Sequence, residues 1–184
     1  GNGLLAAGDR FGAEGVAVVD ARYTAAEKIR VQVLDAAGVK RGESADAIDV
    51  AGGRLARLDV VAAEQARAGM PLAVQVFGYD VYGNLIRDFG SQNLRVRLMS
   101  ADASPIEAPV LTAREFKDGT ALFMMTPFRA GKLVLQAVDE VTGAAGTSKA
   151  VEVKAGEVAS YQVQAPGSAV AHEPFPVEIM ALDR

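Results

Sequence analysis

The sequence repeats itself at a distance of 103 residues. Residues 50–80 align without a gap with residues 153–183, and valine, glycine, proline and aspartate recur at matching positions. A shift of 104 residues then aligns KIRVQVLD (28–35) with KLVLQAVD (132–139). An internal period of about 100 residues predicts a series of similar folding units, each long enough to bury a core of its own.

The repeat divides the chain into one whole unit and two partial ones. We expect a complete unit at 53–154, the C-terminal half of another unit at 1–52, and the N-terminal strands of a third at 155–184. Since natural proteins seldom begin and end inside a folding unit, we interpret the chain as a fragment of a longer array. Partial units expose strand edges and apolar faces, so we predict that they associate head to tail between chains or are poorly ordered.

Within each unit, apolar residues alternate with polar ones, as they do in β-strands that bury one face. Two segments contain helix-forming residues, but proline and glycine occur in their counterparts. We therefore predict a loop leading into a strand at 20–30 and an extended bridge at 62–69. Seven short strands in about 100 residues predict an all-β fold, namely immunoglobulin-like β-sandwiches in tandem. The strands are expected near 54–62, 71–79, 93–99, 108–114, 119–126, 131–139 and 149–154.

The turns of the complete unit follow a recurring order. It runs through Pro71, Asp80-x-Tyr82-Gly83-Asn84, Asp118-Gly119-Thr120-Ala121, Ala130-Gly131-Lys132-Leu133 and Gly146-x-Ser148. This order resembles the bacterial Ig-like repeats of invasin- and intimin-like surface proteins, and filamin repeats have a similar pattern. The resemblance implies a structural or adhesive module of a secreted or cell-surface bacterial protein.

Charge and composition exclude several classes of partner. The net charge of −4 gives no basic footprint for nucleic acid or an anionic membrane. No apolar run approaches the ~20 residues of a membrane-spanning helix. The absence of cysteine excludes disulfides, thiolate zinc sites and cysteine nucleophiles. We expect the partners to be neighbouring repeats of the same parent chain and, at the cell surface, another protein or a glycan.

The corner GYDVYGNLIRDF (78–89) is the main candidate for a binding site. Asp80 with Asn84 or Asp88 offers oxygen ligands for calcium. The stretch lacks the dense acidic spacing of a dedicated calcium loop. An aspartate at a strand end also accepts hydrogen bonds from the backbone N–H groups that follow it, and Gly83 and Asn84 tolerate positive φ. We favour a structural corner, with no metal or other cofactor.

Other candidate sites have simpler structural interpretations. His172, the only histidine, aligns with Gly69 and is expected in a solvated loop rather than in a catalytic site. The segments 36–44 and 143–148 are expected to be hairpin loops, since GAAGTS lacks the lysine of a phosphate-binding loop. Tyr79, Tyr82 and Phe89 gather around the corner, where stacked aromatic rings can bind sugars. Because tryptophan is absent, we expect the two tyrosines to pack at a domain junction instead. The apolar run Leu122–Met125 is expected to be buried core rather than an adaptable binding face.

These observations favour a non-catalytic spacer or adhesive module. A carbohydrate- or calcium-dependent binding module that accompanies an enzyme in a longer chain remains the alternative. An intracellular filamin-like scaffold is a third possibility, because a chain without cysteine also suits the cytosol.

Overall fold

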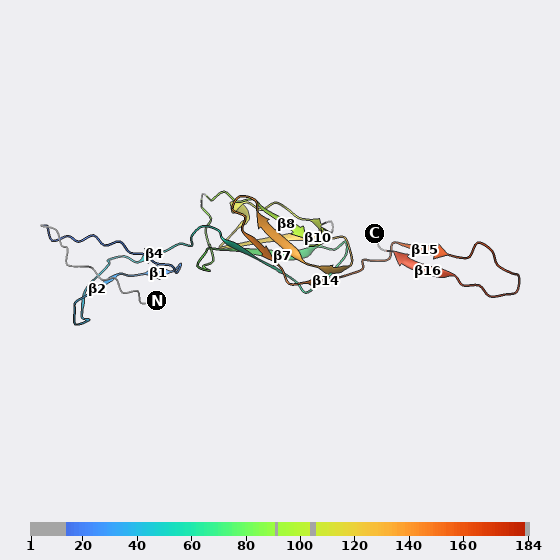
Figure 1. Ribbon diagram of the computed structural model, residues 1–184, viewed down its shortest axis with the longest axis horizontal. Helices are drawn as coiled ribbons and strands as arrows, with labels where there is room; N and C mark the ends of the chain where they lie inside the picture. Colours follow the sequence, from blue (N-terminus) through green and yellow to red (C-terminus); the bar gives the residue numbers. More distant parts are fainter. Residues whose placement is uncertain (1–13, 91, 104–105, 183–184) are drawn as a thin grey trace.

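The computed structural model describes residues 14–90, 92–103 and 106–182 (Figure 1). Strands dominate these ranges, in which the helical structure is a single 3₁₀ turn, η1 (Ala113–Glu115). No helix in this part of the chain is long or apolar enough to span a membrane. The prediction of an all-β fold of immunoglobulin-like sandwich type is confirmed.

The central sandwich has two layers of strands. The first sheet has the order β5-β7-β10-β9 and is antiparallel throughout. The second layer contains two ladders, β13-β12-β8 and β11-β14-β6, in which β6 runs parallel to β14. The bounds are β5 (Arg57–Ala62), β6 (Gln65–Arg67), β7 (Leu72–Tyr79), β8 (Val96–Ser100), β9 (Ile106–Glu107), β10 (Thr120–Pro127), β11 (Gly131–Leu133), β12 (Leu135–Asp139), β13 (Ala145–Thr147) and β14 (Val151–Lys154).

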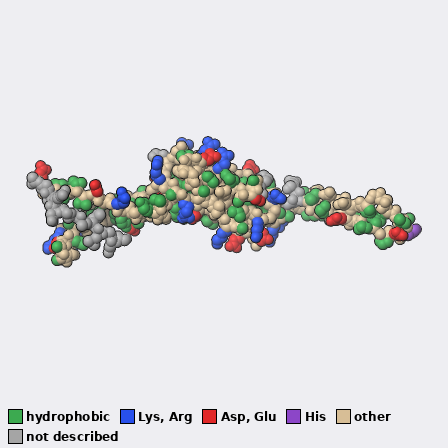
Figure 2. Space-filling model, in the orientation of Figure 1, with side chains coloured by type: hydrophobic (Ala, Val, Ile, Leu, Met, Phe, Trp, Pro, Cys, Tyr) green, Lys and Arg blue, Asp and Glu red, His purple; other side chains and the backbone are tan. Residues whose placement is uncertain are grey.

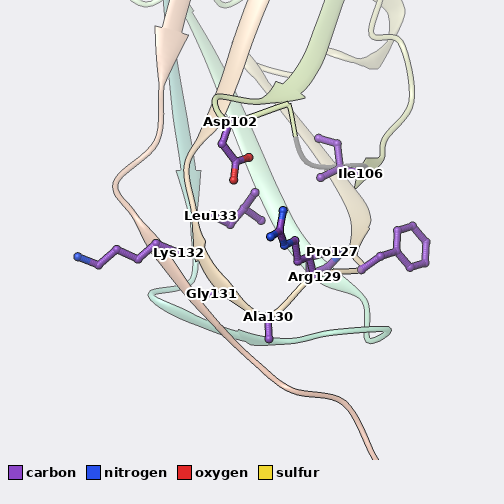
Figure 3. A pocket seen from close by; sticks show the side chains of 9 residues that line it. Asp102, Ile106, Pro127, Arg129, Ala130, Gly131, Lys132 and Leu133 are labelled. Carbon is purple, nitrogen blue, oxygen red and sulfur yellow. The ribbon is translucent and has the colours of Figure 1, made fainter. Parts of the chain in front are cut away.

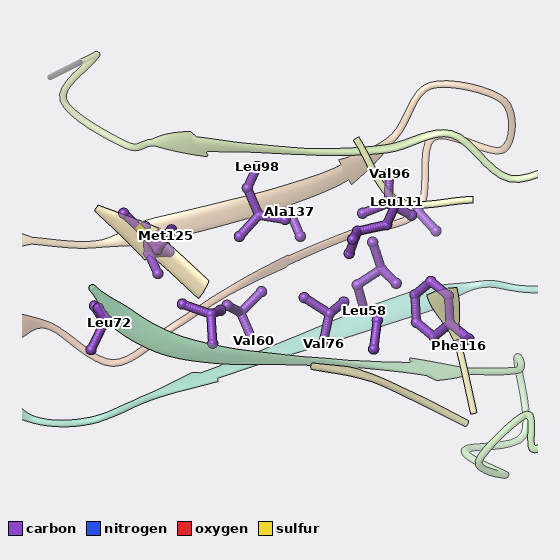
Figure 4. Close-up of a cluster of buried hydrophobic side chains, with 14 of the residues drawn as sticks. Leu58, Val60, Leu72, Val76, Val96, Leu98, Leu111, Phe116, Met125 and Ala137 are labelled. Carbon is purple, nitrogen blue, oxygen red and sulfur yellow. The ribbon is translucent and has the colours of Figure 1, made fainter. Parts of the chain in front are cut away.

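The core lies between the two layers because every second residue of each strand points inward. In β7, Leu72, Val74 and Val76 are buried, while the residues between them are partly or fully exposed. Each such side chain stabilises the fold by about 1.5–3 kcal/mol relative to an exposed one. Figure 4 shows side chains from both layers meeting in this space. They include Leu58, Val60, Val96, Leu98, Leu111, Phe116, Met125 and Ala137.

Short two-stranded elements flank the sandwich, and Figure 1 places them at opposite ends of the molecule. On the N-terminal side, β1 (Lys28–Ile29) pairs with β4 (Ile48–Asp49), and β2 (Gln32–Leu34) pairs with β3 (Lys40–Glu43). On the C-terminal side, β15 (Ser160–Gln164) and β16 (Glu178–Leu182) form one hairpin.

The flanking elements have the pairing registers of the sandwich. Ile29 pairs with Ile48 as Leu133 pairs with Val151. Val33 pairs with Gly42 as Ala137 pairs with Gly146. At the other end, Val163 pairs with Ile179 as Val60 pairs with Val76. The N-terminal hairpins therefore correspond to β11–β14, and the C-terminal hairpin corresponds to β5 and β7.

The hydroxyl of Ser44 and that of Ser148 also make equivalent hydrogen bonds. Ser148 Oγ accepts a bond from the backbone N–H of Leu135 (3.0 Å), and Ser44 Oγ accepts one from the N–H of Val31 (3.2 Å). In each case the serine N–H returns a bond of 2.8 Å to the carbonyl of the same partner. The hairpins thus share side-chain contacts as well as strand register.

Two sequence-based expectations about the strands were wrong, and a third was right in kind but not in extent. Residues 108–114 do not form a strand. Leu111 makes only an isolated bridge to Val96, and Thr112 then caps η1 together with Glu115. This T-x-x-E capping box is a recognisable sequence signature that competes with strand formation.

The expected hairpins at 36–44 and 143–148 are present, since β2 pairs with β3 and β12 pairs with β13, but their loops are shorter than expected. Pairing resumes at Lys40 in β3 and at Ala145 in β13. In each loop the aspartate that ends the preceding strand and a glycine at positive φ, Gly38 or Gly143, complete the reversal within a few residues.

The apolar run Leu122–Met125 is not uniformly buried. Met125 lies in the core, whereas the side chains of Leu122 and Met124 are 65% and 57% exposed. Strand alternation continues through the run, so its apolar residues lie on both faces of the sheet.

Candidate functional site

The corner after β7 is closed by the Asp80 carboxylate. Its Oδ1 accepts hydrogen bonds from the backbone N–H groups of Tyr82 and Asn84, both at 2.9 Å. Its Oδ2 accepts bonds of 2.9 Å from the Gly53 N–H and from Asn84 Nδ2. The backbone closes the same loop, since Asp80 N–H donates to Asn84 O and Gly83 N–H donates to Asp80 O. The predicted structural corner is the geometry observed.

The Asp80 carboxylate is buried, with 5% of the residue exposed. Burial alone would raise its pKa, but the bonds from Asn84, Gly53 and Tyr82 outweigh burial and hold the pKa below its ordinary value. A carboxylate has about four acceptor positions, and these four donors occupy them. A calcium ion at Asp80 would have to displace donors that already neutralise the buried charge.

The other two calcium candidates also have structural partners. Asp88 Oδ1 accepts a bond of 2.7 Å from the Gly90 N–H, which caps its own turn. Asn84 Oδ1 accepts a bond from the Ala26 N–H. Among the described residues, no three histidine, aspartate or glutamate side chains gather closely enough to hold a metal ion.

Asn84 connects the corner to the preceding hairpins. Its Nδ2 donates to the Thr24 carbonyl at 2.6 Å, and its Oδ1 accepts from the Ala26 N–H at 3.0 Å. The same amide holds Asp80, which in turn holds Gly53 at the end of the linker. We call this group, Asp80 and Asn84 with Gly53 and residues 24–26, the junction clamp.

The sequence did not predict the partner of Asn84. Asn84 was expected to tolerate positive φ in the turn, but among the described residues of the corner only Gly83 (φ 84°) has positive φ. Asn84 instead contributes its side-chain amide, which both donates and accepts. The interaction joins residues about 60 positions apart in the sequence, so no pattern of neighbouring residues could predict it.

Asp139 and Asp35 close the corresponding turns after β12 and β2. Asp139 is fully buried, and its carboxylate accepts bonds from Arg95 N–H (2.8 Å), Thr142 N–H (2.9 Å) and Thr142 Oγ (2.6 Å). Burial would raise its pKa, and these bonds lower it below the ordinary value. Asp35 Oδ1 accepts from the N–H groups of Ala37 and Val39, and the bond from Val39 is the main reason that its pKa is also lowered.

His172 lies in the exposed loop between β15 and β16, as expected. Its φ of 68° is left-handed, and its counterpart Gly69 has φ 75°. The histidine therefore occupies a turn position that suits glycine better. Asp183, the counterpart of Asp80, lies outside the described residues.

The three aromatic residues near the corner do not form one cluster, and Tyr82 does not pack at the junction as expected. Phe89 is core, with its ring 4.7 Å from that of Phe116. Tyr79 lies beneath the Arg57 guanidinium, 4.5 Å from it, and Tyr82 is exposed. The absence of a side chain at Gly78 admits Phe89, because a Cβ there would lie 2.5 Å from the ring.

An apolar patch covers part of the outer face of the first sheet. Leu122 and Val61 flank Gln75 from the neighbouring strands, and Met124 lies opposite Ala73. We call Val61, Leu122 and Met124, all exposed, the outer-face patch. Exposed methionine and branched apolar side chains can adapt to the surface of another protein.

A shallow pocket of about 220 Å³ opens at the end of the sandwich opposite the corner (Figure 3). Asp102, Ile106 and the loop 127–133 line it. Its volume is below the ~300–1,000 Å³ of typical small-molecule sites. The loop residues Phe128 and Ala130 are the counterparts of Thr24 and Ala26, which the junction clamp holds in the preceding hairpins.

The fold and site define an immunoglobulin-like β-sandwich with a hydrogen-bonded junction. No family model matches the chain, and no curated protein matches it. Among solved structures, the chain is similar to the Escherichia coli adhesin FdeC, with a TM-score of 0.43 and 20% sequence identity over 75% of this chain and 45% of that chain. The chain thus spans less than half the length of that solved chain.

Proposed function

We propose that the chain is part of a tandem array of Ig-like units that acts as a spacer in a secreted or cell-surface bacterial protein. The observation that carries this proposal is the junction clamp, in which the Asn84 side chain bonds to the backbone of the preceding element. The matching registers of the flanking hairpins support the repeat. The bacterial surface location rests on the resemblance of the turn order to invasin- and intimin-like repeats.

The clamp suits a semi-rigid rod. In a linear array each unit contacts mainly its neighbours, so the length of the array grows with the number of units. Gly52 packs closely on Ile86, where a Cβ would lie 3.2 Å from Ile86 Cα, and Gly53 is bonded to Asp80. A linker held at two points leaves little freedom to bend. We expect the loop 127–133 to receive the corner of a following unit in the same way.

The way in which two buried polar groups are used supports a non-catalytic role. The buried carboxylates Asp80 and Asp139 accept bonds from backbone or neighbouring side-chain donors, which makes them fixed parts of two turns. General acid–base or metal chemistry needs a group that can exchange protons or ligands with a substrate. We assign both aspartates to structure.

Thermal unfolding with calcium or with EDTA, together with a glycan array, tests the spacer against the carbohydrate- or calcium-dependent alternative. We expect equal melting temperatures in both conditions, because the Asp80 acceptor positions are occupied, and no glycan hits. A calcium-dependent rise in melting temperature that is lost in Asp88→Asn, or a saturable glycan signal, would instead support the binding module.

The outer-face patch favours adhesion as a second function of the same unit. Its residues are exposed, and their contribution to the core is small. The double substitution Leu122→Ser and Met124→Ser should abolish adhesion of protein-coated beads to cell surfaces while leaving the melting temperature unchanged. The matched control is Leu98→Ser, a core change that should lower the melting temperature. Equal adhesion of wild type and the double variant would show that the outer-face patch is not the adhesive surface.

A further inference from the structure

The strands that open the sandwich are bonded directly to the strand that closes it. β6 follows β5 after a short break and runs parallel to β14. The paired residues are Gln65 with Glu152, Ala66 with Val153, and Arg67 with Lys154. At one end of this ladder the Glu152 N–H donates to the Glu64 carbonyl at 2.8 Å. At the other end the Ala68 N–H donates to the Lys154 carbonyl at 2.9 Å.

The flanking elements leave the sandwich at opposite ends (Figure 1), and Figure 2 shows them as narrow extensions of the wider central unit. The chain enters β5 beside the corner, where Arg57 pairs with Tyr79. It leaves β14 at the other end of the sandwich, where Lys154 accepts the bond from Ala68. A pull on the two flanking elements therefore draws β5 and β6 one way and β14 the other way, along the axes of the strands.

A pull in this direction loads the β6–β14 ladder in shear. The bonds of a parallel ladder run across the strands at even spacing, so strands that slide past each other must break them together. Strands that are separated sideways from one end break the same bonds one after another. Forced unfolding depends on the unfolding rate and not on the equilibrium stability. The direction of the pull can therefore decide the force at which the unit opens.

The surroundings of β14 oppose sliding as well. β14 also pairs with β11 on its other edge, and its Val151 and Val153 side chains are buried in the core. β13, which precedes β14, crosses β5 so closely that a Cβ on Gly146 would lie 1.9 Å from the Leu58 carbonyl oxygen. To slide out of the sandwich, β14 must break two ladders and withdraw two core side chains at once.

We propose that the β6–β14 ladder makes the unit load-bearing, because it joins the entering and leaving strands against a pull along the molecule. A spacer needs a fixed length but no resistance to a pulling force. The load-bearing role thus goes beyond the proposed function, and it can fail while the spacer function stands.

Single-molecule force spectroscopy on the full chain tests the proposal by changing the direction of the pull. Since the chain has no cysteine, handles can be attached at Arg54→Cys and Ala155→Cys, two exposed positions on either side of the unit. The matched control has handles at Met70→Cys and Ala155→Cys, which lie just beyond the same end of the ladder and separate its strands pair by pair. We expect the first pair of handles to need about twice the unfolding force of the second, or more.

Ala68→Pro removes one bond of the ladder and preserves the turn that follows β6. The Met70 N–H donates to the Arg67 carbonyl at 3.1 Å, and Gly69 has φ 75°. Arg67–Met70 is therefore a type II turn with Ala68 at its second position, where proline is favoured. Proline has no N–H to donate to Lys154. With handles at the two ends of the unit, we expect the unfolding force to fall by about a quarter or more, because the ladder has few bonds.

Ala171→Pro is the matched control for this substitution. Ala171 is the counterpart of Ala68 in the turn between β15 and β16, where the Glu173 N–H donates to the Val170 carbonyl at 3.2 Å. This turn lies outside the β6–β14 ladder. Ala171→Pro should therefore leave the unfolding force of the central unit unchanged.

Two results would overturn the proposal. The first is an equal unfolding force in the two pulling directions. The second is an Ala68→Pro unit that opens at the same force as wild type. The comparison of directions needs no substitution within the ladder, so it decides the proposal even where Ala68→Pro fails to fold.

Discussion

Single aspartates close the turns that follow β2, β7 and β12. Asp139 is the most deeply placed, with its carboxylate bonded to Arg95 and Thr142. An asparagine there presents an NH₂ group to an N–H donor, so at least one buried bond is lost. We expect Asp139→Asn to lower the free energy of unfolding by about 1–3 kcal/mol.

Urea unfolding at pH 7 measures this loss. The matched control is Asp59→Asn, since Asp59 is a partly exposed aspartate that pairs with Arg57 on the sheet surface. Exposed ion pairs contribute at most about 1 kcal/mol, so the control should change stability little. Equal losses in the two variants would contradict the special role of the buried carboxylate.

The lowered pKa values of Asp80 and Asp139 predict a pH dependence. Since the folded pKa lies below the unfolded value of about 3.9, the stability that these groups contribute is complete above that value. It is lost as the pH falls below about 4 through the folded pKa. Melting temperatures from pH 7 to pH 2 should show a steeper acid decline for wild type than for Asp139→Asn. An equally steep acid decline in the two proteins would contradict a contribution of the Asp139 carboxylate to this pH dependence.

Among the contacts between strands, the close crossing of β13 over β5 leaves the least room for an added side chain. Gly146→Ala would place a Cβ 1.9 Å from the Leu58 carbonyl oxygen, so the layers must separate. Overpacking of this kind typically costs about 1–3 kcal/mol or more. Gly42→Ala, at the equivalent position with open space, should cost less than about 0.5 kcal/mol in a single copy. Thermal unfolding at low concentration compares them, and equal losses would show that the crossing tolerates a side chain.

Strand existence was predictable because alternation is a local property. The inward residues of β7 and β12 follow the period-two pattern, and the repeat transferred the same pattern to β2 and β16. The ends of strands were less predictable, as η1 and β13 show. At η1 a capping box replaces the end of the expected strand. At β13 pairing resumes two residues into the expected loop. Each of these features competes with β propensity over only a few residues.

Only the contacts of the candidate site that lie within the corner itself were predictable from the sequence. The sequence indicated that Asp80 would accept bonds from the N–H groups that follow it, and Tyr82 and Asn84 provide them. It could not indicate that Gly53 and the backbone of residues 24–26 would complete the clamp, because those contacts depend on how separate elements meet. The exposure of Leu122 and Met124 was missed because apolar type was given more weight than position in the strand.

The proposed rod depends on a stiff junction between the N-terminal hairpins and the sandwich. Asn84→Ala removes both side-chain bonds to residues 24–26 and one bond to Asp80. Tyr82→Ala is the matched control, since Tyr82 contributes its backbone N–H to the corner and its side chain is exposed.

The most direct test is a distance distribution across this junction. The chain has no cysteine, so spin labels can be placed at Ala36→Cys and Leu122→Cys without further changes. Double electron–electron resonance should give a narrow distribution for wild type and for Tyr82→Ala, and a clearly broader one for Asn84→Ala. A wild-type distribution as broad as that of Asn84→Ala would contradict the clamp, and with it the rod-like spacer.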